Sequence, residues 1–287
     1  MADYYFKTPA PGLGDVFFSH FVNAAHTYPK MSLSAQKIFQ RIKILDPESK
    51  IEVLIFSGND QIELFYQRCP DIDQLTILPY YPDHESEASK IVSGKKNVLD
   101  LFTDEWEDNP CPEFFMDKKE KKIAQSIMDN GPFVALHPFG GRPERDMRGN
   151  ININEIIDTI CQKFNCVLLG GNCVRTENYQ TTINLNQNID YNRSNLFNLI
   201  NVGTSRLHGY LSAKCKKFVG VASCYCVTAA AFNVPSLVFN SEKLKIWHDN
   251  PWDAIGYFLK TRNTNVQYFN KMTDDLHVVL NNFLNEK

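Results

Sequence analysis

Short apolar runs recur along the chain, separated by turn residues and by segments with helical spacing. Runs of this length with apolar residues at successive positions are typical of strands buried on both faces of a parallel sheet. The strands predicted in this way are residues 3–7, 51–56, 75–78, 133–137, 166–169, 218–221 and 236–239. Strands that alternate with helices indicate an α/β fold.

Helical spacing fills most of the intervals between these strands. The predicted helices are residues 16–28, 60–68, 117–129, 153–164, 193–200 and 205–214, with an alanine-rich helix that begins near Ser223. Residues 80–116 hold many Pro, Asp and Glu with weak periodicity, and no element is assigned there.

A break in this alternation of strands and helices predicts a domain boundary. Asn130-Gly131-Pro132 follows a charge-rich helix, and glycine with proline ends a helix cleanly. We therefore expect two Rossmann-like domains that face a central cleft, residues 1–130 and 131–287. The last helix is a candidate to pack back on the first domain. Ligands are expected at the carboxyl ends of the strands.

Composition and charge narrow the class of protein. The chain has 287 residues and a net charge of −3, which argues against a broad nucleic-acid footprint. It has no signal-peptide pattern at its start and no apolar run that approaches the ~20 residues of a membrane span. Its eight cysteines include no CxxC pair, so we expect reduced thiols, a cytoplasmic location and no metal site, even at Cys224-Tyr225-Cys226.

Residues 216–240 raise the first functional question, because they read as strand, turn, helix and strand. In such a unit the free N–H groups at the start of the helix favour an anion. The turn here is Ala222-Ser223-Cys224-Tyr225 rather than a glycine-rich loop. We expect the backbone N–H groups of Ser223, Cys224 and Tyr225 to hold a phosphate group.

Three stretches together resemble the heptosyltransferase-type glycosyltransferases of glycosyltransferase family 9. "GLGDVFFSHFVNAAHTYP" (12–29) is similar to the opening glycine–aspartate turn and helix of that family. "VALHPFGGRPERDMRGN" (134–150) with "CVLLGG" (166–171) is similar to its central strand ends and basic loop. "GTSRLHGYLSAKCKKFVGVASCYCVTAAAFNVPSLVFN" (203–240) is similar to its phosphate-binding region. The three occur in the family's order.

The resemblance implies the GT-B fold and inverting sugar transfer without a metal cofactor. It implies a nucleotide-sugar donor in the second domain and an acceptor in the first, a glycan or lipid-linked saccharide used in polysaccharide biosynthesis. Asp15, after Gly14, matches the family's catalytic base, which would take the proton of the acceptor hydroxyl. The alternative is that Asp15 only caps the first helix.

The resemblance also indicates candidate donor-binding residues. Arg142, Arg145 and Arg148 lie in the loop where the family places a basic residue against the leaving group, with Arg148 nearest by count. The guanidinium group presents its N–H donors in a fixed geometry that suits phosphate oxygens. The alternative is a solvated loop in which Glu144 and Asp146 balance the charge of the arginines. His137 could contact the donor or be a core histidine. Gly170, Gly171 and Asn172 end a strand where the nucleotide base would be read.

The phosphate-binding stretch departs from the family pattern at several positions. Gly220 and Ser223 match, but Ala222 and Val227 stand where the family has aspartate and histidine. These losses put ADP-heptose as donor in doubt. Tyr225 stands where the family has proline, so we expect Tyr225→Pro to change nucleotide binding little, since the first helical turn tolerates a missing donor.

Three functions remain open from the sequence. The first is a glycosyltransferase, and the sequence leaves open whether the protein contacts the inner face of a membrane. The second is a descendant that binds a nucleotide or glycan without transferring it, because side chains that would grip the donor are missing. The third, transfer onto a nucleic-acid base, is disfavoured by the acidic balance.

Overall fold

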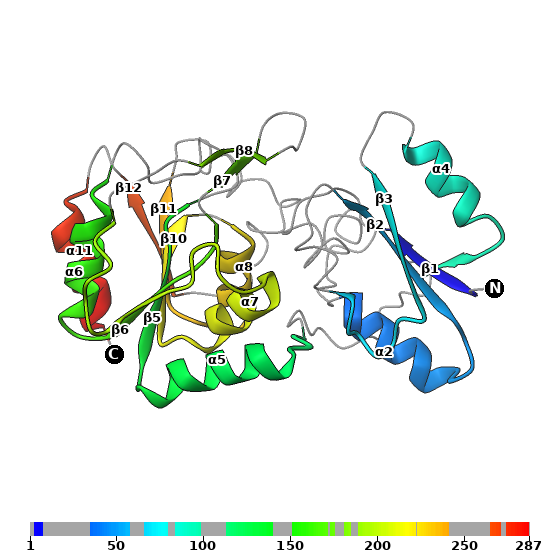
Figure 1. The fold of residues 1–287 in the computed structure, drawn as a ribbon, viewed down its shortest axis with the longest axis horizontal. Coiled ribbons are helices and arrows are strands. Elements are labelled where there is room, and N and C mark those ends of the chain that lie inside the picture. Colours follow the sequence, from blue (N-terminus) through cyan, green and yellow to red (C-terminus); the bar gives the residue numbers. More distant parts are fainter. Residues whose placement is uncertain are drawn as a thin grey trace. The chain divides into compact units, whose positions relative to one another are not determined.

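The computed structural model forms two compact units, Met1–Phe115 and Met116–Lys287 (Figure 1). It describes residues 3–7, 35–57, 66–79, 84–98, 113–139, 151–171, 173–175, 181–184, 189–221, 223–240, 265–270 and 274–286. Each unit is built on one parallel sheet, of four strands in the first and six in the second. The expected pair of parallel α/β sheets is confirmed.

The division between the units falls before helix α5 (Lys118–Asp129), whereas the sequence places a boundary at residue 130, after this helix. Buried polar contacts join α5 to the second unit. Glu120 is buried, and its carboxylate accepts a hydrogen bond from Thr204 Oγ1 and lies 3.2 Å from Arg206 Nη2. Glycine and proline end α5, but they do not separate the units.

The first unit has the strand order β3-β2-β1-β4. Its elements are β1 (Tyr4–Lys7), α2 (Ala35–Leu45), β2 (Ile51–Ser57), β3 (Gln74–Pro79), α4 (His84–Ile91) and β4 (Lys96–Asn97). Successive residues of β1 face opposite sides, as the period of a strand requires. Phe6 packs on Phe39 of α2, with ring centroids 5.6 Å apart, while Tyr5 packs on the cluster that includes Ala88 of α4.

The second unit has the strand order β12-β11-β10-β5-β6-β9, all pairs parallel. Its strands are β5 (Phe133–His137), β6 (Asn165–Leu168), β9 (Leu196–Asn198), β10 (Lys217–Val221), β11 (Ser236–Asn240) and β12 (Val266–Asn270), with a separate antiparallel pair, β7 (Cys173–Arg175) and β8 (Thr181–Asn184). Every residue of β5 and β10 is buried, which explains why both strands are mostly apolar.

Helices cover both faces of this sheet (Figure 1). α6 (Ile153–Cys161) and α11 (Leu276–Asn285) lie on one face, and α7 (Ser205–Lys214) and α8 (Cys224–Ala231) lie on the other. The last helix differs from the expectation that it packs on the first domain. Leu280, Phe283 and Leu284 belong to the core of the second unit, and Lys217 Nζ donates to the carbonyl of Phe283 at 2.5 Å.

Several sequence predictions need correction or fall outside the described residues. The helix predicted over 193–200 is wrong, because Leu196–Asn198 forms β9 and pairs with β6, Val167 opposite Phe197. A short apolar run can satisfy either period, and pairing with the sheet decides it. The predicted helix 16–28 and most of 60–68 lie outside the described residues. No described helix is long and apolar enough to cross a membrane.

The strand order creates a topological switch point in the second unit. The chain moves from β5 through β6 to β9 on one side, and from β10 through β11 to β12 on the other. β5 and β10 therefore lie next to each other where the direction of winding reverses. In open α/β sheets, ligands bind outside the carboxyl ends of the strands at this place.

Candidate functional site

Two residues meet at the switch point, one from the end of each central strand. His137 is the last residue of β5, and Ser223 follows β10 and precedes α8. Ser223 Oγ lies 2.9 Å from His137 Nδ1. We call His137, Gly170, His208, Ser223 and Tyr225, which contact one another here, the switch-point cluster. Three of its members come from strand ends, and His208 and Tyr225 come from α7 and α8.

Two glycines make room for His137. Gly220 pairs with His137 across the sheet, and a Cβ at position 220 would lie 2.6 Å from the His137 carbonyl oxygen. Gly170 follows β6 with a φ of +94°, and a Cβ there would lie 2.5 Å from ring atoms Cδ2 and Nε2 of His137. A side chain at either position would overlap atoms of His137, and at 170 the backbone itself favours glycine.

His208 holds the Gly170 turn in place. The backbone N–H of Gly170 donates to His208 Nδ1 at 3.1 Å, so Nδ1 carries no proton. Nε2 then carries the proton and donates to the carbonyl of Val202 at 2.8 Å. Sequence reasoning missed His208. The available signal was a histidine in the middle of a helix whose neighbours Leu207 and Leu211 are apolar.

Tyr225 contributes its side chain as well as its backbone. Its ring is 6% exposed and packs edge-on against His137, with ring centroids 4.9 Å apart, and against His208 at 5.7 Å. The expectation that Tyr225→Pro changes nucleotide binding little stays a prediction, but the packing gives the Tyr225 side chain a structural role that the sequence did not indicate. The family resemblance concerns only the backbone at this position, whereas here an aromatic ring fills the space between two histidines.

The switch-point cluster is electrically neutral. Burial lowers the pKa of His137 to about 3, with the nearby His208 as a smaller cause. Burial also lowers the pKa of His208 to about 4. Burial raises the pKa of the Tyr225 phenol well above its usual value. None of these side chains can supply positive charge at neutral pH, so they act through packing and hydrogen bonds.

The N-terminus of α8 is capped by Ser223. Its Oγ accepts from the backbone N–H of Cys226 at 3.4 Å and is also hydrogen-bonded to His137 Nδ1, the direction of that bond being set by the histidine tautomer. The cap uses the N–H of Cys226, so this donor of the first turn is not available to a ligand. Val227, at the position of the family's histidine, is buried and only 3% exposed.

The remaining predicted site residues are placed as follows. Gly171 follows Gly170, with Asn201 Oδ1 3.3 Å from the position a Cβ would take. The residues that lie outside the described part of the chain are Gly14, Asp15, Arg142, Arg145, Arg148 and Asn172. Within the described part, no group of His, Cys, Asp and Glu could hold a metal ion.

Comparison with known proteins shows the fold. No family model and no curated protein sequence matches the chain. The structure is similar to E. coli ADP-heptose LPS heptosyltransferase II, with a TM-score of 0.55 and 13% identity over 99% of this chain and 98% of that one. It is also similar to a family 9 glycosyltransferase from Veillonella parvula, with a TM-score of 0.55 and 10% identity over 98% and 90% of the two chains.

A third similar structure, E. coli heptosyltransferase WaaC with ADP, has a TM-score of 0.50 and 10% identity, with 98% of each chain covered. At these identities the likeness shows fold alone. The chain has a family 9-like GT-B glycosyltransferase fold over nearly its full length, as the sequence resemblance implied.

The buried Tyr225 ring predicts the effect of substitution. Tyr225→Pro should lower the free energy of unfolding by about 3 kcal/mol or more, because it removes an aromatic side chain from a packed site. Tyr225→Phe keeps the ring and should change it by less than about 1 kcal/mol. Urea unfolding of both variants measures the difference. A proline variant as stable as the wild type would contradict the ring's packing role.

The neutral histidines predict a pH dependence of stability. The unfolded chain binds a proton at each histidine near pH 6.5, whereas the folded protein keeps His137 and His208 neutral to about pH 3 and about pH 4. Stability should therefore fall as pH is lowered from 6.5 toward 4, by up to about 1.4 kcal/mol per pH unit for each histidine. His208→Gln should reduce this slope in denaturant titrations across the range. An unchanged slope would show that His208 is protonated in the folded state.

Proposed function

We propose that the protein is an inverting, metal-independent glycosyltransferase that moves a sugar from a nucleotide-sugar donor to a hydroxyl of a glycan or lipid-linked saccharide. The observation that carries this proposal is the switch point of the second unit, where a capped helix N-terminus follows the central strand β10. It occurs in a chain whose fold matches a heptosyltransferase over 99% of its length. Fold alone does not fix function, so the site has to support the chemistry.

The donor's diphosphate would lie at the N-terminus of α8. Its oxygens would accept from the N–H groups of Cys224 and Tyr225, where the helix dipole favours negative charge. Because the switch-point cluster is neutral, formal positive charge must come from elsewhere. We assign it to an arginine of the loop that follows β5, with Arg148 first and Arg142 and Arg145 as competitors.

The cluster would set the shape of this site rather than its charge. His137 and Ser223 are hydrogen-bonded, so the start of α8 is fixed against the end of β5. His208 fixes the Gly170 turn, beside which Gly171 and Asn172 would contact the nucleotide base. A preorganised site of this kind binds without the cost of ordering its own groups.

The acceptor would bind to the first unit. β1 and β4 are neighbours in its sheet, and β1 is followed along the chain by the segment that carries Asp15. The Asp15 carboxylate would take the proton of the acceptor hydroxyl while its oxygen attacks the anomeric carbon. The bond from that carbon to the diphosphate breaks, and the arginine and the helix N-terminus stabilise the charge that leaves.

The identity of the nucleotide-sugar donor is left open in this proposal, with ADP-heptose in doubt. The family's histidine position is Val227, which is packed in the core and offers no polar group. The same observation favours a second candidate, a protein that binds a nucleotide sugar or glycan without transferring it. Turnover separates the two.

Arginine removal tests the diphosphate site. Arg148→Ala should weaken binding of a nucleoside diphosphate by about 1.5–3 kcal/mol, the range for hydrogen bonds to a charged group. It should weaken the monophosphate less, because most of the charge lies on the second phosphate. Calorimetric titration of both nucleotides measures this, with Arg41→Ala in the first unit as a matched surface control. Equal losses for the two nucleotides, or none after removal of each loop arginine, would contradict a contact between this loop and the diphosphate.

Replacement of Asp15 tests transfer itself. Asp15→Asn keeps the size of the side chain and can still cap a helix, but it cannot act as a base. We expect donor turnover across a panel of nucleotide sugars to fall by a factor of about 100 or more, the scale of general-base catalysis, while nucleotide binding is kept. Binding with no turnover in the wild type would support the non-catalytic candidate instead.

A further inference from the structure

Two cysteines of the second unit, one in α6 and one in β6, lie in contact. Cys161 is the last residue of α6, and Cys166 lies in β6 five positions later. Both are free thiols, and their side chains are hydrogen-bonded to each other. Neither belongs to the switch-point cluster, and the proposed transfer reaction uses neither.

Asn195 holds the two backbone segments together. Its side-chain Nδ2 donates to the carbonyl of Cys161 at 2.8 Å and to that of Phe164 at 3.0 Å, and its own carbonyl accepts from the N–H of Cys166 at 2.9 Å. One residue therefore fixes the end of α6, the turn that follows it and the start of β6. Because the turn is held closed, the two sulfurs stay within reach of each other.

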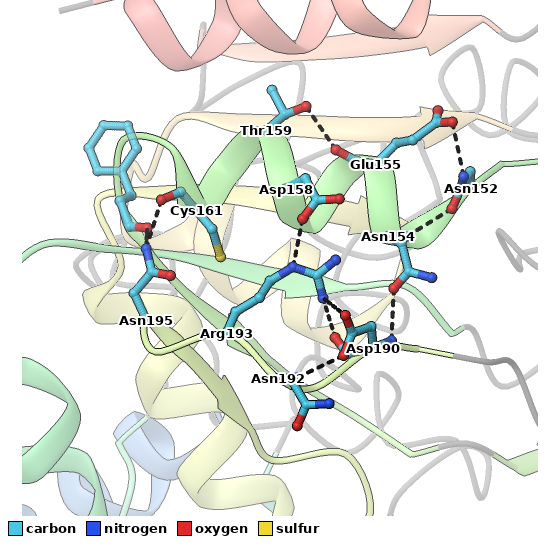
Figure 2. A network of polar contacts seen from close by, with 11 residues as sticks. Asn152, Asn154, Glu155, Asp158, Thr159, Cys161, Asp190, Asn192, Arg193 and Asn195 are labelled. Carbon is cyan, nitrogen blue, oxygen red and sulfur yellow. Dashed lines mark hydrogen bonds and ion pairs between the residues drawn. The ribbon is translucent and has the colours of Figure 1, made fainter.

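The surroundings of the two sulfurs differ. Cys161 is partly exposed, whereas Cys166 is 0% exposed. Figure 2 shows Cys161 on α6 with the guanidinium of Arg193 on the same side. The hydrogen bond from Cys166 and the charge of Arg193 lower the pKa of the Cys161 thiol. Burial raises the pKa of Cys166.

Arg193 is fixed in place by two acidic neighbours. Its Nε donates to Asp158 Oδ1 at 2.6 Å, and its Nη1 donates to the carbonyl of Asp190 (Figure 2). Asp158 belongs to α6, the helix that ends at Cys161, so this helix holds the guanidinium of Arg193 beside Cys161. A partly exposed thiol of lowered pKa with a second cysteine in contact is the arrangement found at redox-sensitive sites.

We propose that Cys161 and Cys166 form an oxidation site, in which hydrogen peroxide converts the pair to a reversible disulfide. The Cys161 thiolate attacks the peroxide, the O–O bond breaks, and an S–O bond forms to give a sulfenic acid and hydroxide. The Cys166 sulfur then attacks the sulfenic sulfur, the S–S bond forms and the S–O bond breaks. The Cys166 proton and the departing hydroxide form water. The two sulfurs lose two electrons in total, and the peroxide gains them.

Three other described cysteines are poorly placed for this chemistry, whereas Cys224, at the start of α8, is partly exposed. Cys69, Cys215 and Cys226 are buried, and burial raises the pKa of each to about 12. Their thiolate fraction at neutral pH is negligible, so a peroxide at low excess should reach Cys161 before them.

Mass spectrometry of the full chain tests the proposal without any substitution. After treatment with hydrogen peroxide at neutral pH and blocking of free thiols, trypsin cuts after Lys163 and separates the two cysteines into peptides 149–163 and 164–175. We expect these peptides to be joined, with fragment ions that assign the link to Cys166 rather than Cys173, and to separate on addition of dithiothreitol. A link to Cys173, irreversible oxidation of Cys161 alone, or prior oxidation of another cysteine would overturn the proposal.

Variants separate the two roles. Cys166→Ser should leave a sulfenic acid on Cys161 that dimedone traps, and Cys161→Ser should abolish the link. Arg193→Gln should slow alkylation of Cys161 at pH 7 by about threefold or more, since each unit of pKa changes the thiolate fraction about tenfold. Arg193→Lys keeps the charge and should slow it less. Equal rates in all three proteins would overturn the role of Arg193.

Discussion

The close contact between β5 and β10 is the constraint on which the second unit depends. Gly220 lies against the carbonyl of His137, where a Cβ would come within 2.6 Å, so the two central strands can pair in this register only with glycine at 220. This pairing sets the switch point and brings His137 to Ser223. The start of α8, the ring of Tyr225 and the Gly170 turn are then fixed by contacts to the two histidines.

The same burial that fixes this cluster also removes its charge. Two neutral imidazoles and a neutral phenol can orient a helix N-terminus, but they cannot neutralise a diphosphate. In the proposed function, the dipole of α8 is therefore joined by the positive charge of an arginine at position 142, 145 or 148. The contributions of the neutral cluster and of the arginine can be tested separately.

The sequence predicted the parallel sheets well because buried strands such as Phe133–His137 begin with a continuous apolar run, here Phe133 to Leu136. It also singled out His137, Gly170 and Ser223, which stand at strand ends and lie together in the structure; their contact with a donor stays a prediction. It missed His208 and the side-chain role of Tyr225, because these depend on contacts between α7, α8 and the strand ends. β9 and the boundary before α5 were also missed, since sheet pairing and the buried Glu120–Arg206 contact decide them.

Hydrogen exchange at the start of α8 tests the central claim most directly. A saturating nucleoside diphosphate should slow exchange of the Cys224 and Tyr225 backbone N–H groups strongly, and the matching monophosphate should slow it less. The N–H of Cys226 already bonds to Ser223 and should change little, which provides an internal control. Protection elsewhere with none at these two positions would contradict the claim that the switch point of the second unit binds the diphosphate.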